Sequence, residues 1–318
     1  MRLTDIVSAD TTAFDHQLQS KLGSTSDNVR HLFRESACAL SQELKDIRTT
    51  ASCDDEEVVA HWIPGRIEVM GKHTDYAGGN SLVCSTDGRG MAMVSSLTPV
   101  GGSPQRKITI ISVLPHGMGH HATHTAAPFL VNGRTVVRHT INLTEDSYCI
   151  DKNDATAKDW RIYPITVVRR LEKNFGLYST DSTKEIGYHI NIAISSNLPP
   201  ASGLSTSSAF VTGLFLVLDS HLGIRLSGTY RQAIATEEGN SAYNLSTYLG
   251  SIENGTCYTR QMTTTLDNEE DTVLLEGTKQ GDGVGTFGGS EDHAAILLGK
   301  KHAFRLLSFC PLGLLRLL

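Results

Sequence analysis

Cysteine, tryptophan and long apolar runs are all scarce in this sequence of 318 residues. Its six cysteines are scattered with no close pair, a spacing that indicates neither a zinc ribbon nor a disulfide framework and favours buried free thiols. No apolar run approaches the roughly 20 residues that a membrane-spanning helix needs. Residues 1–8 also lack the apolar core of a secretory signal. We therefore expect a cytoplasmic protein with no membrane partner.

An excess of basic residues is missing as well. The 28 lysine and arginine residues are outnumbered by 34 aspartate and glutamate residues, which gives a net charge of -6. Because a nucleic-acid-binding protein normally presents a basic face, no nucleic-acid partner is expected. Hydrophobic residues make up 39% of the chain and charged residues 19%, which is typical of a folded globular protein. The composition therefore favours a soluble enzyme.

Apolar periodicity predicts a mixture of helices and strands. Residues 26–47 carry apolar side chains at three- and four-residue steps, the pattern of an amphipathic helix. Short apolar or alternating runs predict strands at residues 58–63, 90–96, 107–113 and 189–195. Further helices are predicted at residues 159–175, 210–218 and 229–249; the second is apolar nearly all round and must be buried.

The segment from Leu198 to Phe210 predicts a turn between a strand and a helix. Two prolines end the strand, and Gly203 lets the backbone turn closely. Residues 205–208 are all serine or threonine and fall where a helix begins, so free backbone N–H groups and the helix dipole could hold a phosphate. No Gly-Lys-Ser/Thr follows, which excludes the Walker pattern. The alternative is that these hydroxyl residues only cap the helix.

Two other segments concentrate groups that can carry chemistry. Residues 64–79 place Arg66, Lys72, His73 and Asp75 among glycines, so donors and a carboxylate can converge on a polyol; a charged hairpin loop is the alternative. Residues 281–295 are rich in glycine and then present Glu291, Asp292 and His293. This pattern is consistent with a carboxylate at a helix start beside a bound phosphate, or with a flexible loop that carries surface acids.

The segment from Leu198 to Phe210 resembles the second motif of the GHMP small-molecule kinases, Pro-x-Gly-x-Gly-Leu-Ser-Ser-Ser-Ala. In this chain Ala201 stands at the first glycine and Ser208 at the alanine. Residues 64–79 resemble the galactokinase signature Gly-Arg-(Ile/Val)-Asn-(Leu/Ile)-Ile-Gly-Glu-His-Thr-Asp-Tyr-Asn-Gly-Gly, but Glu68 replaces the first asparagine and Lys72 replaces the glutamate. The resemblance therefore points to a galactokinase-like sugar kinase.

Two further segments extend the resemblance along the chain. Residues 281–295 occupy, in chain order, the place of the family's Cys-Gly-Ile-Met-Asp-Gln segment, and Asp292 matches its catalytic aspartate. Residues 251–255 are similar to the family's Ala-Glu-Asn segment, which nominates Glu253 as the magnesium ligand. Glu237 and Glu238 are alternatives for that role.

The resemblance implies a role for each candidate residue. The catalytic pair is Asp292, which accepts the proton of the reacting hydroxyl, and Arg66. The implied sugar contacts are Lys72, His73, Asp75 and Tyr76. The implied phosphate contacts are Gly203, Leu204, Ser205, Thr206, Ser207 and Ser208, and the implied Mg²⁺ ligands are Ser207 and Glu253.

The implied function is ATP-dependent phosphorylation of a monosaccharide at the anomeric hydroxyl, which yields a sugar 1-phosphate and ADP. Its cofactors are ATP and Mg²⁺, and its partners are a small sugar and ATP. Because a lysine at a sugar-contacting position favours a carboxylate, Lys72 keeps a uronic acid open beside galactose or arabinose; the alternative is that Lys72 points to solvent. The alternatives are a non-catalytic sugar and ATP sensor, an inactive fragment, or a GHMP kinase for a non-sugar alcohol.

The implied fold is α+β, with a mixed sheet and helices packed on one face. We expect a helical N-terminal segment at residues 1–50 and the GHMP-kinase N-terminal domain, with its phosphate loop, at residues 51–310. Residues 311–318 form an apolar tail with nothing evident to bury against, so we expect a chain truncated there, with the C-terminal α/β domain largely absent. The sequence gives no indication of the oligomeric state.

Overall fold

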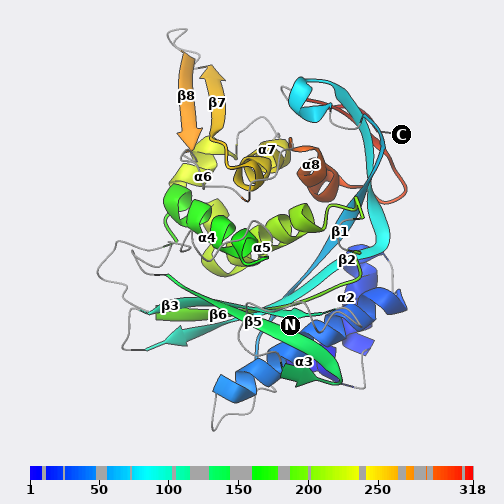
Figure 1. Cartoon of the computed structure of the whole chain (residues 1–318), viewed down its shortest axis with the longest axis vertical. Helices are drawn as coiled ribbons and strands as arrows, with labels where there is room; N and C mark the ends of the chain where they lie inside the picture. The colour runs from blue at the N-terminus through cyan, green and yellow to red at the C-terminus, as the bar shows by residue number, and fades with distance from the viewer. Residues whose placement is uncertain are drawn as a thin grey trace. The chain divides into compact units, whose positions relative to one another are not determined.

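The computed structural model divides the chain into two compact units (Figure 1). Unit 1 comprises Met1–Pro64, Gly88–Cys149 and Thr180–Pro199, and unit 2 comprises Gly65–Asp87, Ile150–Ser179 and Pro200–Leu318. Strands β1 (Val59–Met70) and β2 (Asn80–Val100) pass from one unit into the other. The structure describes residues 1–8, 12–23, 26–47, 56–71, 74–101, 105–114, 129–143, 160–177, 187–199, 202–235, 241–263, 270–275, 284, 289–309 and 312–317.

Unit 1 contains a mixed sheet centred on β6 (Gly187–Ser196). Residues 91–100 of β2 pair with β6 antiparallel, and β3 (Arg106–Val113) pairs with it in parallel on the other side. Strands β5 (Arg134–Asn142) and β4 (Phe129–Val131) extend the sheet by antiparallel pairing. Residues 190–195 of β6 are all buried, and they include the polar side chains of Asn191 and Ser195.

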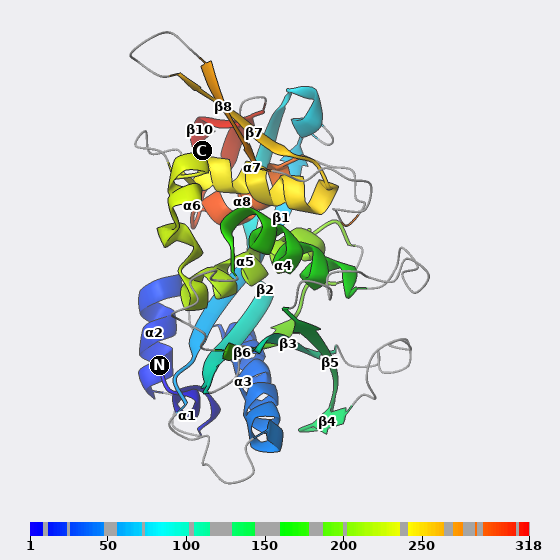
Figure 2. The same cartoon turned by 90° about the vertical axis from the view of Figure 1, so that its left-hand side faces the viewer.

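Three helices precede the strands of unit 1: α1 (Leu3–Val7), α2 (Thr12–Leu22) and α3 (Asp27–Ile47). Helix α3 packs against β6 and β3 and lies along one face of their sheet (Figure 2). Its apolar stripe is buried, as the sequence period predicts. The core of this unit includes the buried side chains of Phe14, Leu32, Phe33, Leu40, Leu44, Ala92, Val94, Ile111, Val136 and Ala193.

Unit 2 is built on four helices that contact one another: α4 (Ile162–Phe175), α5 (Thr206–Leu222), α7 (Ser241–Asn254) and α8 (Glu291–Leu298). Helix α5 buries residues on every side, as predicted, because the other helices surround it. The unit also contains η2 (Ile224–Leu226), α6 (Gly228–Ala233) and the hairpin of β7 (Tyr258–Thr263) and β8 (Glu270–Leu275).

In unit 2, an antiparallel part of the same eight-stranded sheet lies beside α8. Residues 80–83 of β2 pair with β9 (Arg305–Ser308), which pairs with β10 (Gly313–Leu317). Val83 and Leu307 from this sheet form a buried cluster with Ala294 and Ala295 of α8. The short helix η1 (Asp75–Ala77) comes just before this part of β2. Residues 313–317, which lie in the segment predicted as an apolar tail, form strand β10 in this sheet.

Three predicted elements differ from the structure, and one of them is the strand at residues 90–96, which is only part of the longer β2. The predicted helix at residues 229–249 is wrong: α6 ends at Ala233, Ile234 and Ala235 are not helical, and α7 begins at Ser241. Gly239 and Asn240, which have low helix propensity, lie in this interval of the sequence. The strand predicted at residues 58–63 is too short, because β1 continues to Met70 and contains much of the segment considered as a loop.

The α+β fold class with a mixed sheet is confirmed, and the predicted domain boundaries at residues 50 and 310 stay predictions. Among the described residues, no helix is long and apolar enough to cross a membrane. Cys38, Cys84 and Cys257 are free thiols and are half-buried, whereas the other three cysteines lie outside the described residues.

We expect Leu40→Ala to lower the free energy of unfolding by about 2–5 kcal/mol, because it opens a cavity in the core of unit 1. Leu40 is 0% exposed on α3. Urea unfolding followed by circular dichroism measures the change. Leu130→Ala is the matched control, because Leu130 of β4 is 71% exposed and its truncation should change stability by no more than about 0.5 kcal/mol. Equal effects of the two substitutions would contradict this assignment of the core.

Candidate functional site

The turn that leads into α5 has an unusual backbone. Gly203 has φ +72°, and Ser205, the residue before the helix, has φ +57°. The left-handed region is unfavourable for a serine, and such strain concentrates at functional sites. The Ser205 side chain makes no capping hydrogen bond to the helix. The alternative reading of this serine as an ordinary N-cap is therefore wrong.

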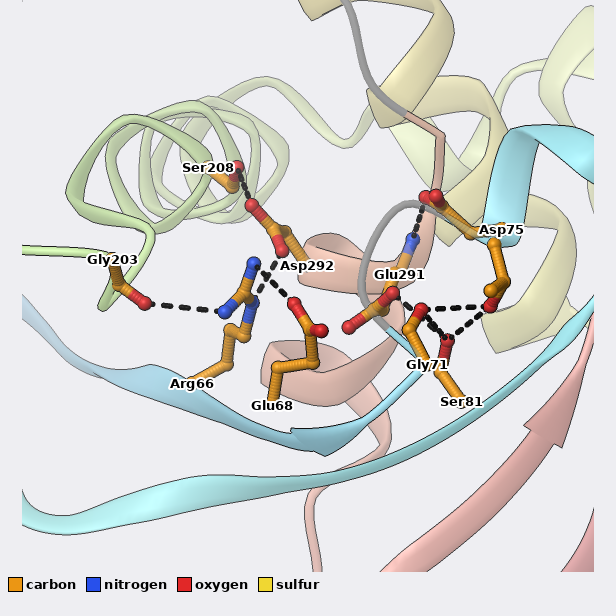
Figure 3. Close-up of polar contacts among 10 residues, drawn as sticks. Arg66, Glu68, Gly71, Asp75, Ser81, Gly203, Ser208, Glu291 and Asp292 are labelled. Atoms are coloured by element: carbon orange, nitrogen blue, oxygen red, sulfur yellow. Dashed lines mark hydrogen bonds and ion pairs between the residues drawn. The ribbon is translucent and has the colours of Figure 1, made fainter.

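Arg66 connects this turn to two other segments of unit 2 (Figure 3). Its backbone N–H donates to the Leu204 carbonyl at 3.2 Å, and its Nη1 donates to the Gly203 carbonyl at 3.1 Å. Its Nε donates to Oδ1 of Asp292, and its Nη2 lies 3.6 Å from Oε2 of Glu68. The guanidinium is thus held on three sides, and Arg66 lies on strand β1 rather than in a loop.

Ser208 continues the polar chain from Asp292 to Glu253. Its Oγ lies 3.3 Å from Oδ2 of Asp292 and 2.9 Å from Oε2 of Glu253. A hydroxyl has one proton, so Ser208 can donate to only one of the two carboxylates at a time. Ser208 is 2% exposed, so its hydroxyl contacts both acids from a buried position. Strand β1 and helices α5, α7 and α8 therefore all contribute to one polar cluster.

Glu253 is buried near the end of α7, and the pKa of its carboxyl is nevertheless below the usual range. Burial alone raises this pKa, because it disfavours the charged form. The adjoining His293 and the hydroxyls of Ser207 and Ser208 lower it by a larger amount. Nε2 of His293 lies 3.2 Å from Oε2 of Glu253. The arrangement keeps Glu253 ionised, as a cation ligand must be.

A second polar cluster surrounds Glu291, the residue before Asp292. Its backbone N–H donates to Oδ2 of Asp75 at 3.3 Å, and its Oε2 lies 3.0 Å from the Ser81 hydroxyl. The hydroxyls of Ser81 and Thr74 also reach the Gly71 carbonyl, at 3.1 and 2.7 Å. Figure 3 shows Glu291 between this group and the Arg66 cluster.

The pKa of Glu291 is raised to about 7, mainly by burial. The Ser81 hydrogen bond and the charge of Arg66 lower it, whereas the charges of Glu68 and Asp75 raise it. Glu291 is 3% exposed. The site therefore contains two buried carboxyl groups in different states: Glu253 is held ionised, whereas Glu291 is largely protonated below neutral pH.

The structure brings together Arg66, Asp292, Gly203, Ser208 and Glu253 from the predicted set. Leu204, Ser205, Thr206 and Ser207 lie in the turn and first turn of α5, and Asp75 lies in the neighbouring cluster. Tyr76 is 57% exposed on η1. Lys72, His73, Glu237 and Glu238 lie outside the described residues.

No sequence pattern assigned a role to Ser81, Glu291 or His293. Glu291 and His293 flank Asp292 at the start of a helix, and this position was the available signal. No sequence pattern distinguishes Ser81, because the fold brings it into contact with Glu291, which is distant in the sequence. In the part of the chain that the structure describes, no three histidine, cysteine or acidic side chains form a group that could hold a metal ion.

Two family models match the chain. GHMP kinases N terminal domain matches residues 163–247, which include most of α4, β6, the turn at Gly203 and α5. Galactokinase galactose-binding signature matches residues 55–96, which include β1 and most of β2. These matches confirm the relation to galactokinase-like GHMP kinases that the motifs predicted.

Solved structures with similarity to the chain include two kinases. Lactococcus lactis galactokinase complexed with galactose is 19% identical, with a TM-score of 0.49, over 88% of this chain and 50% of that one. Methanococcus jannaschii mevalonate kinase is 11% identical, with a TM-score of 0.40, over 80% of this chain and 53% of that one. The chain thus spans about half the length of either kinase.

Glu291 should make the stability of the chain fall as the pH rises from about 4.5 to about 7. Its pKa is about 7 in the folded chain, against an ordinary value of 4.5. Between these pH values the folded state keeps a proton that the unfolded state has released, so the free energy of unfolding decreases with pH and levels off above about pH 7. Over this whole pH range the free energy of unfolding should fall by roughly 3 kcal/mol.

Urea unfolding between about pH 5 and about pH 8 measures this dependence. Glu291→Gln is the matched variant, because its amide oxygen can still accept from Ser81 but the side chain cannot ionise. The variant should lose this part of the pH dependence. If the free energy of unfolding changes with pH equally in the parent and in the variant, Glu291 is not the group that keeps a proton in the folded state.

Proposed function

We propose that this chain, which carries the GHMP-kinase N-terminal domain and the galactokinase signature, transfers the γ-phosphoryl group of ATP to the anomeric hydroxyl of a monosaccharide. The products are a sugar 1-phosphate and ADP. The observation that carries the proposal is the contact chain Arg66–Asp292–Ser208–Glu253. It joins a cation, a candidate base and a phosphate-type turn, which are the groups that phosphoryl transfer to an alcohol needs.

Phosphoryl transfer asks a protein mainly for positioning and for charge neutralisation. In the proposed reaction Asp292 accepts the proton of the anomeric hydroxyl as its oxygen attacks the γ-phosphorus. Arg66 lowers the pKa of that hydroxyl and offsets negative charge that develops on the transferred group. The backbone N–H groups of the turn at residues 203–208 and the dipole of α5 hold the phosphates of ATP.

The side chains of Glu253 and Ser207 have the chemistry that Mg²⁺ prefers, because both present hard oxygen atoms. Mg²⁺ commonly takes one or two protein ligands and completes its shell with phosphate oxygens and water. When bound, Mg²⁺ would neutralise charge on the β- and γ-phosphates. The lowered pKa of Glu253 supports this assignment, because the carboxylate stays charged when it is buried.

For the sugar, we propose contacts from Lys72, His73, Asp75 and Tyr76. The galactokinase signature match over residues 55–96 supports this location. Lys72 replaces a glutamate of the signature and would attract a carboxylate, so uronic acids are candidates beside galactose and arabinose. Glu68 and Lys72 both depart from the signature, and these departures favour a second candidate function, a sensor that binds sugar and ATP without turnover.

We expect Asp292→Asn to abolish most turnover while the affinity for nucleotide changes little. Loss of a positioned base should lower the rate of ADP release from Mg-ATP by about 10²–10⁴-fold. A coupled assay of ADP release measures the rate, and calorimetry measures nucleotide binding. Asp87→Asn is the matched control, because Asp87 is exposed in unit 2. A variant with the parent rate would contradict the role of Asp292.

Lys72→Glu should shift the substrate preference from acidic toward neutral sugars if Lys72 contacts the sugar. The assay compares galactose, arabinose, galacturonate, glucuronate and mevalonate at equal concentration. An unchanged preference would place Lys72 away from the substrate. If the parent protein releases no ADP with any of these compounds but binds a sugar and ATP, the sensor replaces the kinase as the function.

A further inference from the structure

The first turn of α8 is anchored by residues distant in the sequence and not by its own cap. Ser290, the residue before the helix, makes no side-chain capping hydrogen bond. Instead, the N–H of Glu291 donates to the carboxylate of Asp75, 216 residues away. Asp75 is 8% exposed, so this contact is largely shielded from water. An acid at this position also interacts favourably with the helix dipole.

A second contact holds the side chain of the same residue. Ser81 is 0% exposed, and its hydroxyl lies 3.0 Å from Oε2 of Glu291. The other carboxyl oxygen of Glu291 is buried and has no hydrogen-bond partner among the described residues. The Glu291 side chain is therefore fixed chiefly through Ser81. Both the backbone and the side chain of Glu291 depend on the segment from Gly71 to Ser81.

Close packing makes this anchor sensitive to small displacements. A Cβ atom on Gly289 would lie 2.2 Å from Oδ2 of Asp75, which is too close for any side chain. On helix α7, a Cβ atom on Gly250 would lie 3.0 Å from the Gly289 carbonyl. Gly289 thus lies between Asp75 and α7 with no spare room on either side. Glycine is the residue that permits the approach of Asp75 to the helix start.

We propose that Asp75 and Ser81 are positioning residues that fix the first turn of α8 and thereby direct Asp292 toward Arg66 and Ser208. Asp292 follows Glu291 directly, so a shift of the turn moves its carboxylate away from both partners. Displacements of about 1 Å can cost a hundredfold in rate. The catalytic consequence rests on the proposed function, whereas the anchoring itself concerns the chain without ligands. This role is separate from the sugar contact proposed for Asp75.

Amide hydrogen exchange, measured by NMR on the unliganded chain, tests the anchor without reference to activity. Asp75→Ala should speed exchange in the first turn of α8 roughly three- to thirtyfold, the effect of losing a helix cap. Asp75→Asn keeps an acceptor oxygen and should stay close to the parent. Gly289→Ala should behave like Asp75→Ala, and the two changes together should add little because they break the same contact.

Ser227→Ala is the matched control, because Ser227 caps α6 in the same unit by accepting from the N–H of Tyr230 at 3.1 Å. It should speed exchange in α6 and leave α8 unchanged. Parent-like exchange of α8 in both Asp75→Ala and Ser81→Ala would overturn the proposal. If Asp75→Ala fails to fold, the exchange rates of α8 in Ser81→Ala and Gly289→Ala decide instead: rates like those of the parent in both variants would overturn the proposal.

Kinetics then separate positioning from sugar contact. Ser81→Ala should lower kcat at least tenfold and leave the KM for sugar within about threefold, since Ser81 reaches Asp292 only through Glu291. A raised KM with unchanged kcat would assign this segment to substrate binding alone and overturn the positioning role. If the parent protein shows no turnover, the proposed kinase function is refuted, but the hydrogen-exchange test of the anchor is unaffected. Failure of the proposed function is therefore distinguishable from failure of the anchor.

Discussion

The ion pair between Arg66 and Asp292 is the interaction on which the rest of the site depends. A guanidinium has five donors in a rigid plane, and here they face an aspartate, a glutamate and a backbone carbonyl from separate segments. These contacts of Arg66 hold strand β1, the turn before α5 and the start of α8 together. In this cluster the carboxylates of Glu68, Asp292 and Glu253 outnumber the single guanidinium. A polyphosphate would therefore need added positive charge to bind beside them.

Two buried glutamates with nearly equal exposure show how neighbours decide protonation. Glu253 is 6% exposed and Glu291 is 3% exposed, so burial alone would raise the pKa of both. For Glu253, the imidazole of His293 and the hydroxyls of Ser207 and Ser208 lower the pKa below its usual value. For Glu291, the carboxylates of Glu68 and Asp75 raise the pKa further. Opposed environments of this kind separate the charge states of similar acids within one site.

The sequence predicted the elements whose patterns are local. The apolar stripe of α3, the buried α5 and the carboxylate at the start of α8 follow from periodicity and from residue type. The break between α6 and α7 was missed although Gly239 and Asn240, which have low helix propensity, lie in this interval of the sequence. The contacts of Ser81 and Glu291 could not be predicted, because they join residues 210 positions apart and leave no periodic trace. The strained φ of Ser205 likewise depends on the fold around it.

The lack of space at Gly289 has an evolutionary consequence. A chain that gained even a methyl group there would collide with the carboxylate of Asp75. It could tolerate the change only with a shorter side chain at the partner position, which would in turn remove the acceptor for the helix start. The two positions are therefore expected to vary together or not at all, and neither can drift independently while the helix start keeps its place. Such a linked pair offers a sequence marker for chains that share this way of holding the catalytic helix.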